Sequence, residues 1–307
     1  MNTPVKQSFS SNNEVKWCPG CGDYAILAAM QRFLPSTGLN PEQIVFVSGI
    51  GCAGRFPYYM NTYGFHVIHG RAPAVATGIK TMRPDLSVWL VTGDGDGLSI
   101  GASHLLHCLR RNLNINILLL NNQIYGLTKG QASPTSPLGQ LSKTSPKGSL
   151  VEPLNPIKMA LSAGATFVAR GLDKDPKQLA KIFEQANQHQ GTSFIEIYQN
   201  CPIFNDDAFE RYDDKRTRQD HVIYLEQDSV MKFSTSSYLQ EDLTISDSLE
   251  QAMVHDSSNL KQANTLASLE QKSLPLPLGI FYQVDKPIYS PQEKKVNATF
   301  TDLNNLV

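Results

Sequence analysis

Two short polar motifs follow apolar segments that have the composition of buried strands. A Gly-Asp-Gly motif centred on Asp94 comes after residues 88–92, and an Asn-Asn pair that ends at Asn122 comes after residues 115–120. In a parallel sheet both motifs would lie at the carboxyl ends of their strands, where open α/β folds bind ligands. A carboxylate beside an amide oxygen forms a hard oxygen site for a divalent cation such as Mg²⁺. The flanking glycines let a diphosphate approach the backbone.

Two neighbouring features support a diphosphate ligand at this edge. A helix is predicted to begin at Leu98, directly after the glycine-rich motif, and a helix N-terminus favours phosphate oxygens. His69 and Gly70 lie at the end of another predicted strand, residues 67–69, and offer hydrogen-bond donors to the same edge. Taken alone, His69 is more simply explained as an ordinary histidine at a strand end.

Cysteines provide the second chemical signal. The chain has five, of which Cys18, Cys21, Cys52 and Cys201 are predicted at the ends of elements. The spacing of Cys18 and Cys21 lets two thiolates reach one metal centre. Cys108 falls among leucines inside a predicted helix and is expected to be a buried apolar residue. The pattern indicates a four-thiolate site, for which a [4Fe-4S] cluster and a zinc ion remain equally open.

Two alternative interpretations of these glycines and cysteines fit less well. A thiol-disulfide exchange motif at Cys18 and Cys21 expects a preceding strand, but residues 10–16 are polar, and it leaves Cys52 and Cys201 unexplained. The G-x-G-x-x-G pattern at residues 49–54 has no acidic residue in the 30 positions after it, so a nicotinamide site is rejected.

Composition predicts a soluble cytoplasmic enzyme subunit. The chain has 307 residues and a net charge of −1, so no electrostatic attraction to nucleic acid or to acidic membranes is expected. No apolar run is long enough to span a bilayer. Residues 1–16 are polar and lack the apolar core of a signal peptide.

Apolar segments of strand and helix character alternate along the first two thirds of the chain. This alternation predicts an α/β fold with a parallel sheet covered by helices on both faces. We expect a binding domain at residues 1–204 and, at 205–307, a partly irregular C-terminal extension that packs on the body or on a partner subunit. Residues 125–153 predict a functional loop. The predicted helices are 23–33 (with Asp23 as its cap), 71–82, 98–111, 155–163 and 177–188, and the predicted strands are 44–48, 67–69, 88–92, 115–120, 166–169, 193–198 and a final one within 278–284.

With these motifs in place, residues 17–170 resemble the β subunit of the 2-oxoacid:ferredoxin oxidoreductases, in particular the 2-oxoglutarate branch. The resemblance is carried by the segments WCPGCGDYAIL, GIGCAGRFPYYMNTYGFHVIHGRAPAVATG, VTGDGDGLSIGASHL and LLLNNQIYGLTKGQASPTS. The segments NCPIFND and PLGIFYQVDKPIY also fit this family. The resemblance implies the thiamine-diphosphate-binding fold.

The resemblance also implies roles for individual residues. Cys18, Cys21, Cys52 and Cys201 match the ligands of a [4Fe-4S] cluster. Asp94, Asn122 and the backbone carbonyl of Ile124 match the Mg²⁺ ligands. Residues matching positions around thiamine diphosphate or in the loop over it are Gly51, His69, Gly70, Gly93, Gly95, Asp96, Gly126, Leu127 and Thr128.

The implied reaction is the thiamine-dependent oxidative decarboxylation of 2-oxoglutarate with coenzyme A, with electrons passing through the cluster to ferredoxin. The implied partner is an α subunit that supplies the activating glutamate, in an (αβ)₂ assembly. Lys129 is our candidate for the distal carboxylate of the substrate, with Arg55 and His69 as further catalytic candidates. The alternatives are a β subunit for pyruvate or branched-chain 2-oxoacids, a non-catalytic iron-sulfur carrier, and a thiamine decarboxylase with structural zinc.

Overall fold

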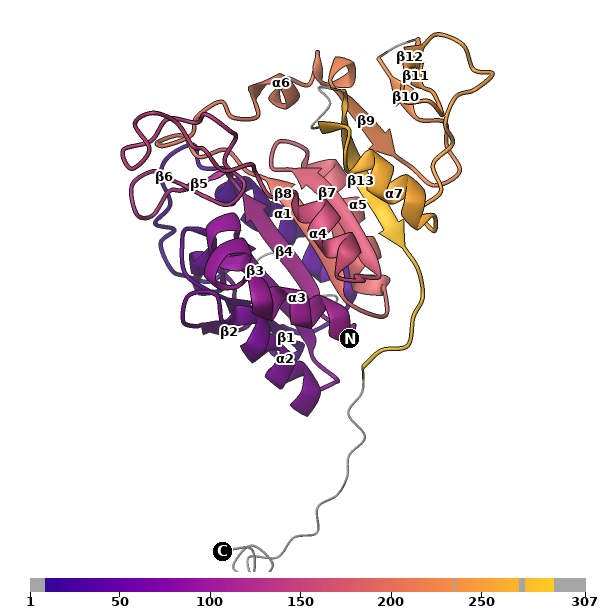
Figure 1. Cartoon of the computed structure of the whole chain (residues 1–307). Coiled ribbons are helices and arrows are strands. Elements are labelled where there is room, and N and C mark those ends of the chain that lie inside the picture. The colour runs from indigo at the N-terminus through magenta and orange to yellow at the C-terminus, as the bar shows by residue number, and fades with distance from the viewer. Residues whose placement is uncertain (1–8, 235, 271–273, 290–307) are drawn as a thin grey trace, which may run out of the picture.

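An eight-stranded sheet forms the centre of the molecule (Figure 1). The computed structural model describes residues 9–234, 236–270 and 274–289. The strand order is β2-β1-β3-β4-β8-β7-β13-β9, and every neighbouring pair is parallel except β7 with β13. Its strands are β1 (Ile44–Ser48), β2 (Tyr63–His66), β3 (Ser87–Gly93), β4 (Asn116–Asn121), β7 (Phe167–Leu172), β8 (Ser193–Tyr198), β9 (Val222–Leu225) and β13 (Leu276–Gln283).

Helices cover both faces of this sheet (Figure 1). Side chains of α1 and α5 pack on one face, and those of α2, α3, α4 and α7 pack on the other. Pro176 and the side chain of Asp175 start α5, because Asp175 accepts a hydrogen bond from the amide of Gln178 at 3.2 Å. The helices are α1 (Asp23–Phe33), α2 (Ala72–Met82), α3 (Ala102–Arg111), α4 (Pro156–Ser162), α5 (Pro176–Gln188), α6 (Glu210–Asp213) and α7 (Leu260–Leu266).

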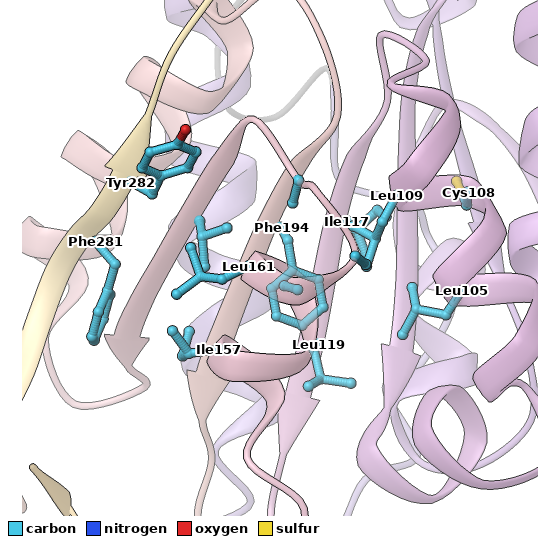
Figure 2. Packing of buried hydrophobic residues seen from close by; sticks show 14 of the residues in the cluster. Leu105, Cys108, Leu109, Ile117, Leu119, Ile157, Leu161, Phe194, Phe281 and Tyr282 are labelled. Carbon is cyan, nitrogen blue, oxygen red and sulfur yellow. The ribbon is translucent and has the colours of Figure 1, made fainter. Parts of the chain in front are cut away.

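The core between the sheet and α3 and α4 is built from side chains distant in sequence. Figure 2 shows Leu105 and Leu109 of α3 near Ile117 of β4, and Phe194 of β8 near Leu161 of α4. Cys108 is buried in this cluster, which confirms its interpretation as an apolar core residue. A dense core on both faces fixes the strand ends that carry the polar motifs.

Most of the predicted elements are confirmed. The predicted helices 23–33, 71–82, 155–163 and 177–188 correspond to α1, α2, α4 and α5. The predicted strands 44–48, 88–92, 115–120, 166–169 and 193–198 correspond to β1, β3, β4, β7 and β8, and the last predicted strand is β13. Residues 125–153 form a long loop whose regular part is a hairpin of β5 (Ile124–Tyr125) and β6 (Gln131–Ala132).

Three local predictions were wrong. Residues 67–69 are not a strand, since β2 lies before them on the exposed edge and the chain then turns at Gly70, where φ is +71°. Asp23 does not cap α1, because the N-cap position is held by Gly22. Only glycine fits there, since a Cβ on residue 22 would lie 1.9 Å from a carboxylate oxygen of Asp173. The helix predicted at 98–111 is confirmed as α3 from Ala102 to Arg111, but its predicted start is wrong. Residues 96–100 form a π-helical turn, η5 (Asp96–Ile100), in which the amide of Gly101 bonds the carbonyl of Asp96.

Residues after 204 contribute to the same sheet. β13 pairs with β7, and β9 pairs with β13 at the edge. A separate antiparallel sheet, β10 (Lys232–Phe233), β11 (Ser237–Leu239) and β12 (Ile245–Ser246), lies between β9 and α7 in the sequence. The boundary at residue 204 stays a prediction, and residues 290–307 of the predicted extension lie outside the described residues.

None of the helices within the described ranges has the length and apolar character needed to cross a membrane.

Candidate functional site

The two motifs meet at one edge of the sheet. β3 and β4 are parallel neighbours with Gly93 opposite Leu120, so Asp94 and Asn122 leave the sheet side by side. Both line a cavity of about 190 Å³. The other residues predicted from the sequence that line this cavity are Gly51, Cys52, His69, Gly93, Gly95, Asp96, Ile124, Gly126, Leu127 and Thr128.

Asp94 is almost fully buried, with 2% of its surface exposed. Burial raises the pKa of its carboxyl to about 6, although hydroxyl and backbone donors around it favour the ionised form. The Thr135 hydroxyl oxygen lies 2.7 Å from Asp94 Oδ2. A buried carboxylate with so few compensating charges is a strong acceptor for a cation.

The chain after β4 is folded tightly around Asn122. Asn122 Oδ1 accepts a hydrogen bond from the amide of Ile124 at 3.1 Å, across Gln123, whose φ is +57°. This turn leads directly into Tyr125, whose hydroxyl donates to the carbonyl of Gly95 at 3.1 Å. A Cβ on Gly95 would lie 2.1 Å from the Tyr125 ring, so only glycine fits there.

Asp96 joins three segments of the site. Its Oδ1 accepts hydrogen bonds from the amides of Ile50 at 3.0 Å and Gly70 at 2.7 Å, and lies 2.5 Å from His69 Nδ1. Its Oδ2 accepts from the Thr92 hydroxyl at 2.7 Å. Asp96 lines the cavity, but its oxygens are engaged by donors of the chain itself, which makes it an organiser of the surrounding turns.

The four predicted cysteine ligands lie at the same end of the sheet. Cys52 follows the turn after β1, Cys201 follows β8, and Cys18 and Cys21 form the turn before α1, with a hydrogen bond of 3.0 Å between their backbones. Burial raises the pKa of the Cys52 thiol to about 12, and nearby Asp23, Cys201 and Cys18 add to this effect. All five cysteines are free.

Space and hydrogen bonds around the sulfurs suit a sulfur-rich centre. A Cβ on Gly126 would lie 3.4 Å from Cys201 Sγ and 3.9 Å from Cys52 Sγ, so glycine keeps this side open. Gln199 Nε2 donates to Cys21 Sγ at 3.2 Å. In the described ranges no three His, Cys, Asp or Glu side chains are already arranged to hold a metal ion, so the sulfurs would have to close around one.

Besides Cys18, Cys21 and Cys201, three predicted residues do not line the cavity. Gly70 acts from outside it through its amide bond to Asp96. Lys129 is exposed, with φ at +77°, immediately after the cavity residue Thr128. Arg55 lines a different cavity of about 410 Å³, next to Lys16 and donating to its carbonyl at 3.3 Å.

Three buried polar residues beneath the site were not predicted from the sequence. Thr135, Glu196 and Gln199 are all buried near the predicted ligands. Glu196 is a carboxylate within the otherwise apolar strand β8, and Arg170 is a guanidinium within β7, both without exposed surface. The sequence did hold a sign of this buried pair, because charged residues are rare in strands that are buried on both faces.

The chain is similar to known thiamine enzymes over this site. Residues 49–197 match the family model of the thiamine pyrophosphate enzyme, C-terminal TPP binding domain. The chain is 48% identical over 295 residues to 2-oxoglutarate oxidoreductase subunit KorB of Mycobacterium tuberculosis, covering 92% of this chain and 79% of that one. It is 46% identical over 202 residues to the 2-oxoacid:ferredoxin oxidoreductase subunit beta of Saccharolobus solfataricus, covering 65% and 66% of the two chains.

A solved structure shares the fold. The 2-oxoglutarate:ferredoxin oxidoreductase from Magnetococcus marinus, with 2-oxoglutarate, coenzyme A and succinyl-CoA bound, aligns with a TM-score of 0.82 at 33% identity, over 100% of this chain and 97% of that chain. Fold, site and sequence agree, and the chain belongs to the β subunits of the 2-oxoacid:ferredoxin oxidoreductase family.

Proposed function

We propose that this chain is the β subunit of an enzyme that converts 2-oxoglutarate and coenzyme A to succinyl-CoA and CO₂, with the released electron pair passing to ferredoxin. The printed names of the Mycobacterium and Magnetococcus relatives support this substrate and this co-substrate. The observation that carries the proposal is the placement of Asp94 and Asn122 in one cavity, at the ends of the paired strands β3 and β4.

The donor set at this cavity fits Mg²⁺ and a diphosphate. Asp94, Asn122 and the carbonyl of Ile124 would hold the ion, because hard oxygen donors are the ligands that Mg²⁺ prefers. Gly51 leaves the backbone accessible beside it, because a Cβ there would meet no atom within 4 Å. When bound, thiamine diphosphate supplies the carbanion that adds to the keto carbon and accepts the electrons left by CO₂.

The placement of the cysteines supports an iron-sulfur centre, because the Sγ atoms of Cys52 and Cys201 both lie beside Gly126. Burial and nearby negative charge raise the pKa of the Cys52 and Cys21 thiols. A cluster ligated by Cys18, Cys21, Cys52 and Cys201 would supply the compensating positive charge. It would lie beside Gly126, which borders both the sulfurs and the cofactor cavity.

Activity requires a partner chain in this proposal. No glutamate is among the described residues that line the cavity holding Asp94. The glutamate that activates the cofactor ring would therefore come from an α subunit, in an (αβ)₂ assembly. Ferredoxin would accept the electrons from the cluster.

We further propose Lys129 as the residue that pairs with the distal carboxylate of the substrate. Its side chain is exposed in the loop that follows the cavity residue Thr128, and its backbone amide is held by the carbonyl of Gly126 at 3.0 Å. Arg55 is the weaker candidate because it faces another cavity. His69 would hold a proton at Nδ1 beside the Asp96 carboxylate.

Co-expression with the α subunit, followed by a viologen-reduction assay with several 2-oxoacids and coenzyme A, tests the proposal. We expect turnover of 2-oxoglutarate, a large loss for Asp94→Asn, and unchanged turnover for Asp85→Asn, an exposed aspartate paired with Arg83. Full activity of Asp94→Asn would reject the cation site. A preference for pyruvate or branched-chain acids would reject the substrate, and a colourless zinc protein would reject the cluster.

The role of Lys129 needs a comparison between substrates. Lys129→Met keeps the apolar stem and removes the charge, so it should raise the KM for 2-oxoglutarate far more than that for pyruvate. Lys143→Met, also on an exposed part of the long loop, is the matched control and should change neither KM. Equal losses for both substrates would show that Lys129 acts on loop structure rather than on the distal carboxylate.

A further inference from the structure

A buried polar chain runs from Asp94 to a charged pair inside the sheet. Thr135, 3% exposed, places its hydroxyl oxygen 2.7 Å from Asp94 Oδ2 and 2.8 Å from Asn121 Oδ1. The segment that carries Thr135 is fixed in turn, because the Ser136 hydroxyl donates to the carbonyl of Gln123 at 2.6 Å. Thr135 and Ser136 together thus tie the long loop to the ends of β3 and β4.

The orientation of the Asn121 amide is determined by its neighbours. Asn121 Nδ2 donates to Glu196 Oε1 at 2.8 Å, and only the nitrogen can donate to a carboxylate. The amide oxygen must then face Thr135, where it also accepts the amide of Gln123 at 3.1 Å. Asn121 therefore cannot flip without losing its contacts to Glu196 and to the Gln123 amide.

Glu196 is itself held by Arg170. Arg170 Nε donates to Glu196 Oε2 at 2.7 Å, and neither side chain has exposed surface. The guanidinium also lies 5.0 Å from the centre of the Tyr198 ring and 3.4 Å from Glu270 Oε2. A buried ion pair adds little to stability compared with apolar packing, so a geometric role better explains its place beneath the site.

The count of protons gives the direction of the Thr135 hydrogen bond. A threonine hydroxyl has one proton and here has two acceptors. Asn121 Oδ1 already accepts the Gln123 amide, and an ionised carboxylate is the stronger acceptor, so the Thr135 hydroxyl donates its hydrogen bond to Asp94 Oδ2 and not to Asn121. With Oδ2 engaged, the carboxylate can turn its other oxygen to a cation.

We propose that Thr135 is a positioning residue that orients the Asp94 carboxylate for the cation. Asn121, held by Glu196 and Arg170, fixes the turn at Gln123, and Ser136 anchors the Thr135 segment to that turn. This inference rests on the proposed function, since it concerns the Mg²⁺ and thiamine diphosphate site. Thr135 touches neither ligand in this account. Thr135 acts through Asp94. Its loss should therefore affect cofactor affinity more than the rate of the chemical step.

Calorimetric titration of the cofactor-free αβ assembly with thiamine diphosphate and Mg²⁺ tests this role without an activity readout. We expect Thr135→Val to weaken Mg²⁺-dependent binding by about tenfold or more, in line with the loss of a group that orients a metal ligand. Thr135→Ser keeps the hydroxyl and should bind within about twofold of wild type. Thr135→Ala gives the same expectation as valine if the valine variant does not assemble.

Thr166→Val is the matched control. Thr166 is fully buried and bonds Asn112 Oδ1 at 2.7 Å just before β7, so its loss costs stability without touching the cation site. We expect its cofactor affinity to match wild type. Wild-type affinity in Thr135→Val, or equal losses in the serine and valine variants, would overturn the inference alone. Failure of the wild-type assembly to bind the cofactor would overturn the proposed function and the inference together.

Discussion

The backbone amide of Gly70 donates a hydrogen bond of 2.7 Å to the carboxylate of Asp96. The two residues come from different strand ends, and the bond closes the turn after β2 against the π-helical turn after β3. A Cβ on Gly70 would lie 2.6 Å from the amide nitrogen of Gly101, so the backbones touch here. The shape of the cofactor cavity depends on this contact as much as on the residues that face the ligand.

Removal of the Asp96 carboxylate should therefore loosen several segments at once. Asp96→Ala leaves the amides of Ile50 and Gly70 without their acceptor, and we expect a loss of about 3 kcal/mol in the free energy of unfolding. Urea unfolding of the cofactor-free protein measures this change. A loss below about 0.5 kcal/mol would mean that the carboxylate does not organise these turns.

Gly49 should tolerate no side chain. A Cβ there would lie 2.0 Å from Asp96 Oδ2, so Gly49→Ala should displace the carboxylate and abolish cofactor binding. Gly78 in α2 has open space around its Cβ position, and Gly78→Ala should stabilise the protein by up to about 1 kcal/mol. Thermal unfolding and cofactor titration of both variants check the contrast. Normal cofactor affinity in Gly49→Ala would contradict the packing.

Cation binding should depend on pH through Asp94. The folded-state pKa of Asp94 is raised to about 6 from 3.8, so in the cation-free protein this group contributes stability below about pH 4 that is lost as pH rises through 6. A proton and Mg²⁺ compete for the same carboxylate. Mg²⁺ affinity should fall by up to about tenfold per pH unit below 6 and level off above it.

Calorimetry of the cofactor-free assembly between about pH 5 and about pH 8 measures this profile. The side chain of residue 94 cannot titrate in Asp94→Asn, so the affinity of any residual Mg²⁺ binding by that variant should not fall below about pH 6 as it does in wild type. A wild-type profile that stays flat across the range would show that Asp94 does not carry the competing proton.

Gln199 should tune the proposed cluster. Its amide donates to Cys21 Sγ at 3.2 Å, and hydrogen bonds to cluster sulfurs favour the reduced, more negative state. Gln199→Leu should lower the midpoint potential in an EPR-monitored redox titration of the holoenzyme. Gln185→Leu, on α5 and lining another cavity, is the control and should leave the potential unchanged. An unchanged potential in Gln199→Leu would remove this role.

The sequence predicted those parts of the fold that local chemistry determines. Apolar runs such as residues 88–92 and 115–120 were enough to place β3 and β4, and the motifs after them had to share an edge once the sheet was parallel. The burial of Cys108 could also be predicted, because leucines surround it at helical spacing.

The remaining features depend on contacts between distant segments. Residues 67–69 have the apolar composition of a strand, but the chain turns at Gly70, where the backbone amide bonds the carboxylate of Asp96. Gly22 rather than Asp23 is the N-cap residue of α1, and only glycine fits there because Asp173 and Asn200 approach it from another part of the chain. Thr135 lies in a polar loop whose composition gives no sign of burial, and only the fold brings it to Asp94.

The most direct test of the account is an X-ray structure of the αβ assembly with thiamine diphosphate and Mg²⁺ bound. The account predicts oxygens of Asp94 and Asn122 at about 2.1 Å from one ion that also contacts the diphosphate. An ion held elsewhere, or a site in which either side chain lies beyond coordination distance, would contradict it.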